Sequence, residues 1–183
     1  MRTLLLLSSL CVAGTAQATV VLKMDRAEMT QMSDDVLMVR VGAQRVVEEQ
    51  PGALVTLTDL EVLESFKGKY EAGDTVLLQQ AGGVKGDWVM HIPGKNTYRF
   101  GETLVLFLNR HRDRVVPVGV GIGRMVVEGE GDSALLKEEY GDVAFAERNP
   151  KGKMRFMHGP PPSKPVKLSV FRRWISSLLE GSR

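Results

Sequence analysis

The chain has 183 residues, of which 25% are charged and 43% are hydrophobic, with a formal net charge of +2 and one cysteine. This length suits one domain, and a core of that size folds without cross-links. The hydrophobic content argues against global disorder. The small net charge gives no field of the kind that drives non-specific nucleic-acid binding, so we predict one folded domain with no nucleic-acid partner.

The first eighteen residues are typical of an export signal. Arg2 supplies the positive start, residues 4–7 and 10–13 supply a short apolar run, and residues 16–18 form a small-x-small cleavage site. The run is shorter than the roughly 20 residues of a membrane-spanning helix. We therefore predict that residues 1–18 are a signal peptide cleaved after Ala18, with export to the periplasm or the cell exterior. A buried N-terminal helix is the alternative.

The only cysteine, Cys11, lies inside this predicted signal. A chain cleaved after Ala18 contains no thiol, so we expect neither disulfides nor a cysteine nucleophile nor a thiolate zinc site. No later segment approaches 18 uninterrupted apolar residues, so no transmembrane segment is predicted.

Short alternating segments separated by turn residues follow the signal. A helix is predicted over residues 25–32, because Asp25 is a suitable N-cap and Glu28 follows three residues later. Alternation and β-branched content predict strands over residues 19–23, 36–47, 53–66, 75–79, 87–92, 103–108, 115–120 and 124–127. This pattern predicts a mainly β fold, with an antiparallel barrel domain over residues 19–146.

The composition changes near residue 147. Residues 147–183 contain nine Lys and Arg against two Glu, a net charge of +7, whereas residues 19–146 contain fourteen basic and twenty acidic residues, a net charge of −6. Pro160-Pro161-Pro162 with Pro165 predict that residues 147–165 are a basic, Pro-rich linker. Apolar residues at helical spacing predict a C-terminal amphipathic helix over residues 166–181. It is expected to dock on the barrel, with a membrane-surface or partner-binding helix as the alternatives.

This tail carries the candidate partner-binding residues. Its basic cluster suits a phosphate, a lipopolysaccharide or an acidic protein surface, the alternative being that the tail folds against the acidic barrel of its own chain. The cluster lacks interleaved aromatic residues, which makes it a poor nucleic-acid site. The candidates are Arg148, Lys151, Lys153, Arg155, Phe171 and Trp174.

A series of short motifs between residues 34 and 127 resembles a pattern found in uncharacterised exported bacterial proteins. The motifs are Ser33-Asp34-Asp35-Val36, Phe66-Lys67-Gly68, Gly73-Asp74-Thr75-Val76, Gly82-Gly83, Pro93-Gly94, Phe100-Gly101-Glu102, Leu106-Phe107-Leu108 and the glycine-rich residues 119–123. The resemblance implies a small OB-like or netrin-like β-barrel and implies no catalytic residues. Phe66 stands where the pattern usually has Leu, and the disulfides of animal netrin-like domains have no counterpart here.

Three patterns that suggest chemistry fail on spacing or context. The glycines of residues 119–123 resemble a dinucleotide fingerprint, but a strand-like segment follows instead of a helix, so we interpret them as a bent strand. Four carboxylates match a calcium loop, but Ser133 occupies its glycine position. The three histidines lie far apart, and no nucleophile elbow is present. The four carboxylates are Glu128, Glu130, Asp132 and Glu139, and the three histidines are His91, His111 and His158.

We therefore predict no catalytic, cofactor or metal residues, and we assign Asp87 and Glu102 to capping turn amides. The first hypothesis is an exported, non-enzymatic β-barrel module that binds a protein or an envelope component, with possible peripheral contact to an anionic surface. An inhibitor or accessory factor of a secreted peptidase is the second hypothesis. A cryptic metal-dependent hydrolase is the third.

Overall fold

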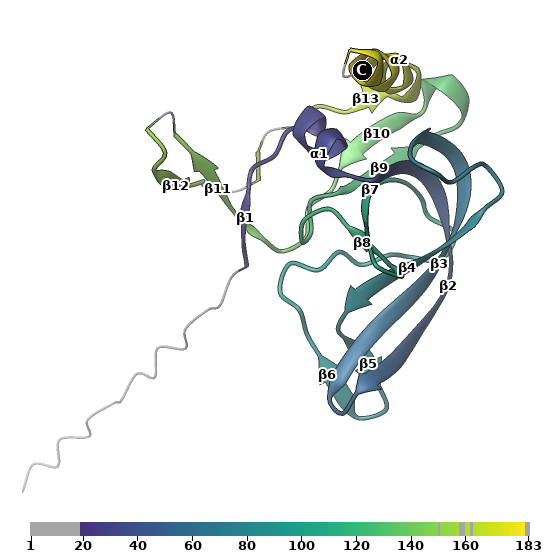
Figure 1. Ribbon diagram of the computed structural model, residues 1–183, viewed down its shortest axis with the longest axis vertical. Coiled ribbons are helices and arrows are strands. Elements are labelled where there is room, and N and C mark those ends of the chain that lie inside the picture. Colours follow the sequence, from purple (N-terminus) through teal and green to yellow (C-terminus); the bar gives the residue numbers. More distant parts are fainter. Residues whose placement is uncertain (1–18, 150, 158–159, 162, 182–183) are drawn as a thin grey trace, which may run out of the picture.

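The computed structural model describes residues 19–149, 151–157, 160, 161 and 163–181, and the predicted signal lies outside them. The fold is mainly β with two α-helices, and Figure 1 shows a β-rich body, a small sheet projecting from its side and a helix at one end. The strands are β1 (Val20–Leu22), β2 (Asp35–Gln50), β3 (Ala53–Lys67), β4 (Thr75–Ala81), β5 (Gly83–Lys85), β6 (Trp88–Met90), β7 (Thr103–His111), β8 (Arg114–Pro117), β9 (Arg124–Glu128), β10 (Leu135–Glu138), β11 (Ala144–Arg148), β12 (Met154–Phe156) and β13 (Val166–Lys167).

Helix α1 (Arg26–Met32) confirms the helix predicted from its capping residues. The Asp25 carboxylate accepts a hydrogen bond from the Glu28 amide at 2.8 Å, and the Glu28 carboxylate accepts one from the Asp25 amide at 2.8 Å. This reciprocal pair satisfies two of the amides that a helix start leaves free. The helix then buries Met29 against the body.

The long hairpin of β2 and β3 forms the frame of the body, and both strands follow the predicted alternation. Their inward residues, such as Val39 and Leu60, are buried, because side chains at every second position point to the same face. The ladder shifts register between Val41 and Gln44. Such bulges bend a strand and let a sheet curve around a core.

The main sheet has eight strands in the order β13-β10-β9-β7-β2-β3-β4-β8, and β8 also pairs with β7. Strands β4 and β8 are parallel and share a single residue pair, Leu78 with Val115. The sheet therefore curls around its apolar core but does not form a closed barrel. The buried side chains of this core include Leu37, Leu60, Leu78, Leu104, Leu106 and Leu108.

A second core lies under helix α2 (Leu168–Glu180), which covers the outer side of the curled sheet. Phe171 and Ile175 are buried there among residues such as Phe107 and Met125. The rings of Phe66 and Phe171 meet edge to face, with their centroids 5.2 Å apart. The amphipathic helix predicted at the C-terminus is present, and it packs on the body of its own chain.

Several strands differ from the sequence-based prediction. Strand β8 ends at Pro117 instead of residue 120: the Val118 amide still donates to the Phe107 carbonyl at 2.8 Å, and the chain then turns at Gly119, whose φ is +62°. The glycine-rich residues 119–123 form the turn to β9, with Gly119 and Gly121 at positive φ, so their interpretation as a bent strand was wrong. Strands β5, β10, β11, β12 and β13 were not predicted. Strand β12 lies inside the segment that we expected to be a linker, and β13 lies at the start of the segment that we expected to be a helix.

Candidate functional site

A three-stranded sheet of β1, β11 and β12 projects from the body (Figure 1). Strand β1 runs parallel to β11, and β12 is antiparallel to β11 and forms an edge of the sheet. The inner face is attached to the body, because Val21 and Phe145 are buried together with Ile122. This packing holds the sheet against the body, and the opposite, outer face of the sheet points away from the body.

The outer face of this sheet carries an apolar row whose two ends are exposed and whose centre, Ala146, is buried. Leu22 lies opposite Ala146, and Ala146 lies opposite Phe156, so the three side chains cross the sheet in register. The side chains at the two ends of the row are exposed, by 43% for Leu22 and 68% for Phe156. Val20 and Met154, also exposed, extend the row on the same face. Large apolar side chains gathered on one face are typical of an interaction site.

The turn between β11 and β12 carries the predicted basic cluster. The side chain of Asn149 accepts hydrogen bonds from the amides of Lys151 and Lys153, at 3.0 and 2.9 Å, and this fixes the shape of the turn. Arg148, Lys151 and Lys153 are exposed, and no ion pair links their side chains to another described residue. Three of the four predicted basic residues therefore keep their charge available, beside the apolar row.

The fourth basic residue, Arg155, faces the other way. Its guanidinium donates to the Glu147 carboxylate at 2.8 Å on the neighbouring strand. The tail also reaches the acidic body through Arg172, whose guanidinium pairs with Glu64 at 2.8 Å and with Asp132. The expectation that the tail folds against the body thus holds for Arg172 and fails for the turn of the projecting sheet.

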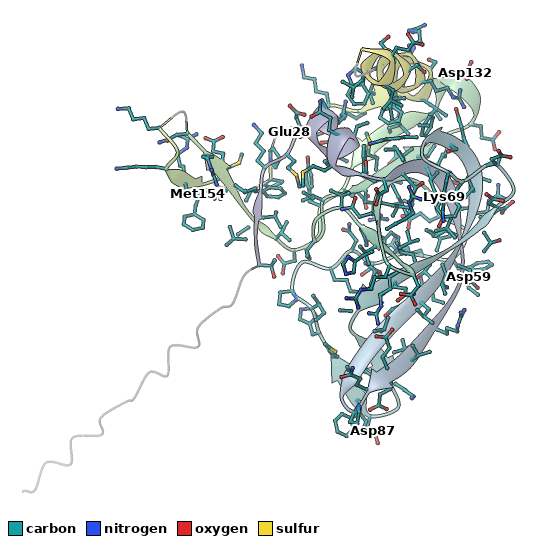
Figure 2. The ribbon with its side chains drawn as sticks, viewed as in Figure 1. Glu28, Asp59, Lys69, Asp87, Asp132 and Met154 are labelled. Carbon is teal, nitrogen blue, oxygen red and sulfur yellow. The ribbon has the colours of Figure 1, made fainter. Side chains whose placement is uncertain are left out.

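Strand β12 has one edge that pairs with no strand of the described residues. The Met157 amide donates to the Phe145 carbonyl, and the Asn149 amide donates to the Lys153 carbonyl, so the odd-numbered residues of β12 face β11. In an antiparallel pair the residues between these direct their N–H and C=O groups to the opposite side. The backbone of Met154, labelled in Figure 2, and of Phe156 therefore faces away from β11, and no strand of the described residues pairs with it.

The two aromatic candidates of the C-terminal helix have different environments. Phe171 is only 1% exposed, so its predicted contact with a partner is not available in this fold. Trp174 is half-buried and lines a cavity of about 570 Å³ between α1, α2 and residues 161, 163, 164 and 166. Helical spacing alone assigns Phe171 and Trp174 to the same apolar side of the helix. The packing of α2 on the body shows that Phe171 is buried and that Trp174 is only half-buried.

A polar network closes one wall of this cavity. The Glu138 carboxylate accepts hydrogen bonds at 2.6 Å from the Arg26 guanidinium and at 2.6 Å from the Tyr140 hydroxyl. Burial alone raises the pKa of Glu138, but the hydrogen bonds from Tyr140 and Ser163 and the charge of Arg26 outweigh it, and the pKa is lowered. Burial and the neighbouring Glu138 carboxylate raise the pKa of Tyr140. These groups satisfy one another and leave no poised acid or base.

Three of the four carboxylates considered as calcium ligands, Glu128, Asp132 and Glu139, lie in separate ion pairs. Glu128 pairs with Lys137 at 2.5 Å, and Glu139 pairs with Arg124 at 2.8 Å. Within the described part of the chain, no cluster of three His, Cys, Asp or Glu side chains could hold a metal ion. Of the predicted histidines, His158 lies outside the described residues.

The assignment of Glu102 to a turn is confirmed, because its carboxylate accepts a hydrogen bond from the Arg99 amide at 3.2 Å. The same carboxylate also pairs with Arg124 at 2.5 Å, which the sequence did not suggest. The Asp87 side chain accepts no hydrogen bond from a turn amide among the described residues.

No protein-family model matches the chain, and searches among curated proteins and among solved structures found no match. The projecting sheet and the cavity beside Trp174 therefore stand on their own geometry. In the part of the chain that the structure describes, no helix is both long and apolar enough to cross a membrane.

Proposed function

We propose that this protein is an exported, non-enzymatic binding module whose projecting sheet captures an extended, acidic segment of a protein partner. The observation that carries the proposal is the row of Leu22, Ala146 and Phe156, whose two ends are exposed and whose central Ala146 is buried, beside three cations that form no ion pair with another described residue. The partner segment adds as a strand to β12 through main-chain hydrogen bonds, its apolar side chains cover the row, and its carboxylates meet the basic turn. Charge at the turn speeds association, and the row supplies affinity.

A second copy of the chain is a poorer occupant of this edge. An antiparallel pair of β12 strands centred on Arg155 would place the same guanidinium of both copies directly opposite each other. Like charges in that position destabilise a strand pair. The two basic turns would lie at opposite ends of such a pair, and the second β12 strand contains no carboxylate to meet either of them. An acidic segment meets none of these costs.

The curled body is proposed to be an OB-like barrel that acts as a scaffold for this sheet. The pairing order β7-β2-β3-β4-β8, with β8 also beside β7, supports this proposal, because an OB-fold is a partly open barrel of five strands. The single pair between β4 and β8 marks where such a barrel would be partly open. Binding at the projecting sheet does not involve the face of the barrel on which OB-folds bind their ligands.

Export is proposed from the signal-like residues 1–18. The first strand supports a cleavage site after Ala18, because β1 begins at Val20 and cleavage there would leave it whole. The side-chain hydroxyl of Thr19 donates to the Pro93 carbonyl at 2.9 Å, which would hold the new N-terminus against the body.

The proposal is tested by cross-linking the chain lacking residues 1–18 in an envelope extract and measuring the affinity of the recovered partner for variants. Met154→Pro removes one outward amide from the edge strand, a substitution that edge strands tolerate, and Met154→Val is the matched control that keeps the amide. Phe156→Asp removes the apolar end of the row. We expect Met154→Pro and Phe156→Asp to lower the affinity at least about tenfold, and Met154→Val to bind normally.

Two results would overturn the proposal. The first is a partner that binds the Met154→Pro and Phe156→Asp variants as tightly as the parent chain, which would place its contact elsewhere. The second is stronger retention by vesicles of anionic phospholipid than by any protein, with the same dependence on Phe156. That result would make the sheet a membrane contact.

A further inference from the structure

A second feature lies at the end of the body formed by the hairpin of β5 and β6, where Figure 2 labels Asp87. Lys95 follows this hairpin in the chain and turns back under it. Its ammonium donates to the Thr56 hydroxyl at 3.0 Å and to the Gly82 carbonyl at 3.2 Å. Both partners are neutral oxygen atoms.

No carboxylate of the described residues forms an ion pair with Lys95. At the end of β2, Glu48 pairs with Lys85 at 3.7 Å and Glu49 pairs with Arg114 at 2.8 Å, and Asp87 in the β5–β6 turn forms no ion pair with Lys95. Burial lowers the pKa of Lys95, since taking an ammonium from water without a counter-charge disfavours its charged form. An ammonium with three donors and two neutral acceptors has one N–H left for a further acceptor.

Lys95 also lines a cavity of about 210 Å³ whose other walls are largely apolar. Val84 and Val89 lie directly opposite each other in the hairpin and form one wall, with exposed fractions of 61% and 71%. Met90 and Ile92 contribute to the same cavity. An unpaired cation thus adjoins apolar side chains that no described residue covers.

We propose that this cavity binds a monocarboxylate that carries a short apolar group. The carboxylate would accept a hydrogen bond from the Lys95 ammonium and supply its missing counter-charge, and the apolar group would cover Val84 and Val89. A single lysine suits one negative charge, whereas phosphate groups are usually held by several donors or an arginine fork. The cavity is smaller than the roughly 300–1,000 Å³ of sites for drug-sized ligands, which limits the apolar group to a few carbons.

The same chemistry comes from two sources, a free short-chain acid or the C-terminal carboxylate of a peptide. The binding surface does not include β1, β11 or β12, so this proposal does not depend on the capture of a partner by the projecting sheet. Failure of either proposal leaves the other intact.

The test is a titration of the chain lacking residues 1–18, followed by NMR of its backbone amides and of the Lys95 side chain. It is done at a constant pH of 8. The probes are pentanoate, acetate, pentanol, N-acetylvaline and N-acetylvaline amide. We expect pentanoate or N-acetylvaline to shift the signals of Val84, Val89 and Lys95 and to raise the pKa of Lys95.

The controls separate charge from apolar contact. Acetate lacks the apolar group, and pentanol and the amide lack the charge, so each should bind about tenfold more weakly or not at all. Lys95→Met should lose the response, and so should Val84→Thr, which keeps the lysine and tests the site if Lys95→Met folds poorly. Lys153→Met, a substitution of an unpaired lysine on the projecting sheet, should bind normally.

The two carboxylate probes distinguish the sources, because tighter binding of N-acetylvaline than of pentanoate indicates a peptide C-terminus. The proposal is overturned if neither carboxylate shifts these signals at millimolar concentration. It is also overturned if the Lys95→Met and Val84→Thr variants keep the affinity of the parent chain, or if pentanol binds as well as pentanoate.

Discussion

The backbone of Gly68 packs directly against the buried carboxylate of Asp35, so that a Cβ atom on Gly68 would overlap the Oδ1 atom of Asp35. That oxygen accepts a hydrogen bond from the Lys69 amide at 3.0 Å, and Oδ2 lies 3.0 Å from the Arg110 guanidinium. Gly68 also has a φ of +111°, a conformation that favours glycine. The contact joins the start of β2 to the end of β3.

Substitution of this glycine is expected to destabilise the fold. Gly68→Ala should lower the free energy of unfolding by about 3 kcal/mol, because overpacking against Asp35 adds to the backbone strain. Gly73→Ala is the matched control, since Gly73 has a φ of +94° and a Cβ atom there would have no neighbour within 4 Å. It should cost only about 1–2 kcal/mol of strain. Urea unfolding measures both, and equal losses would contradict the role of the contact.

Local signals explain which parts of the fold the sequence predicts well. The capping pair of Asp25 and Glu28 acts within one helical turn, so the helix could be predicted from residues close in sequence. The alternation of apolar and polar residues in β2 and β3 likewise indicates which face of each strand is buried. The motifs around Asp35 and Gly68 are separate in the sequence, and the structure shows that they form one corner of the sheet.

Contacts between distant segments explain most of what was missed. Strand β1 pairs with β11 more than 120 residues later in the chain, and three residues such as Val20–Leu22 carry no signal that identifies a partner so far away. The three residues of β12 are equally short, and the surrounding charges and prolines suggested a linker. The basic residues of the candidate site were predicted, whereas the apolar row beside them depends on this long-range pairing.

The buried environment of Phe171 predicts a structural role for this ring. Phe171→Ala should lower the free energy of unfolding by about 3–5 kcal/mol, since it opens a cavity between α2 and the sheet. Val170→Ala is the control on the same helix, because Val170 is 40% exposed and should cost less than about 1 kcal/mol. Both values come from urea unfolding. An unchanged stability of Phe171→Ala would show that the helix does not dock in solution.

The lowered pKa of Glu138 predicts a contribution to stability that depends on pH. A carboxyl whose pKa is lower in the folded chain than in the unfolded chain stabilises the fold fully above the unfolded value, near 4.5. This contribution is lost as the pH falls from 4.5 through the lower folded value, because the unfolded chain takes up the proton first. The stability of the parent chain should therefore fall more steeply below pH 4.5 than that of Glu138→Gln.

Urea unfolding between about pH 3 and pH 7 measures this difference. The stability gap between the parent chain and Glu138→Gln should be constant at neutral pH and should narrow in acid. Glu71→Gln serves as the control, because Glu71 is exposed and forms no ion pair with a described residue, and its gap should stay near zero throughout. A gap for Glu138→Gln that does not change with pH would contradict the network of Arg26 and Tyr140.

The basic turn of the projecting sheet predicts association that depends on salt. Reversing two charges in Lys151→Glu/Lys153→Glu should slow the association with the cross-linked partner and weaken its dependence on ionic strength, while dissociation changes little. The free energy of unfolding should stay within about 0.5 kcal/mol, since neither side chain forms an ion pair within the described residues. The double variant Arg99→Glu/Arg173→Glu changes the net charge equally at two exposed sites elsewhere, and it should leave association nearly unchanged. Equal slowing by both variants would mean that net charge alone steers the encounter, and the turn would lose its specific role.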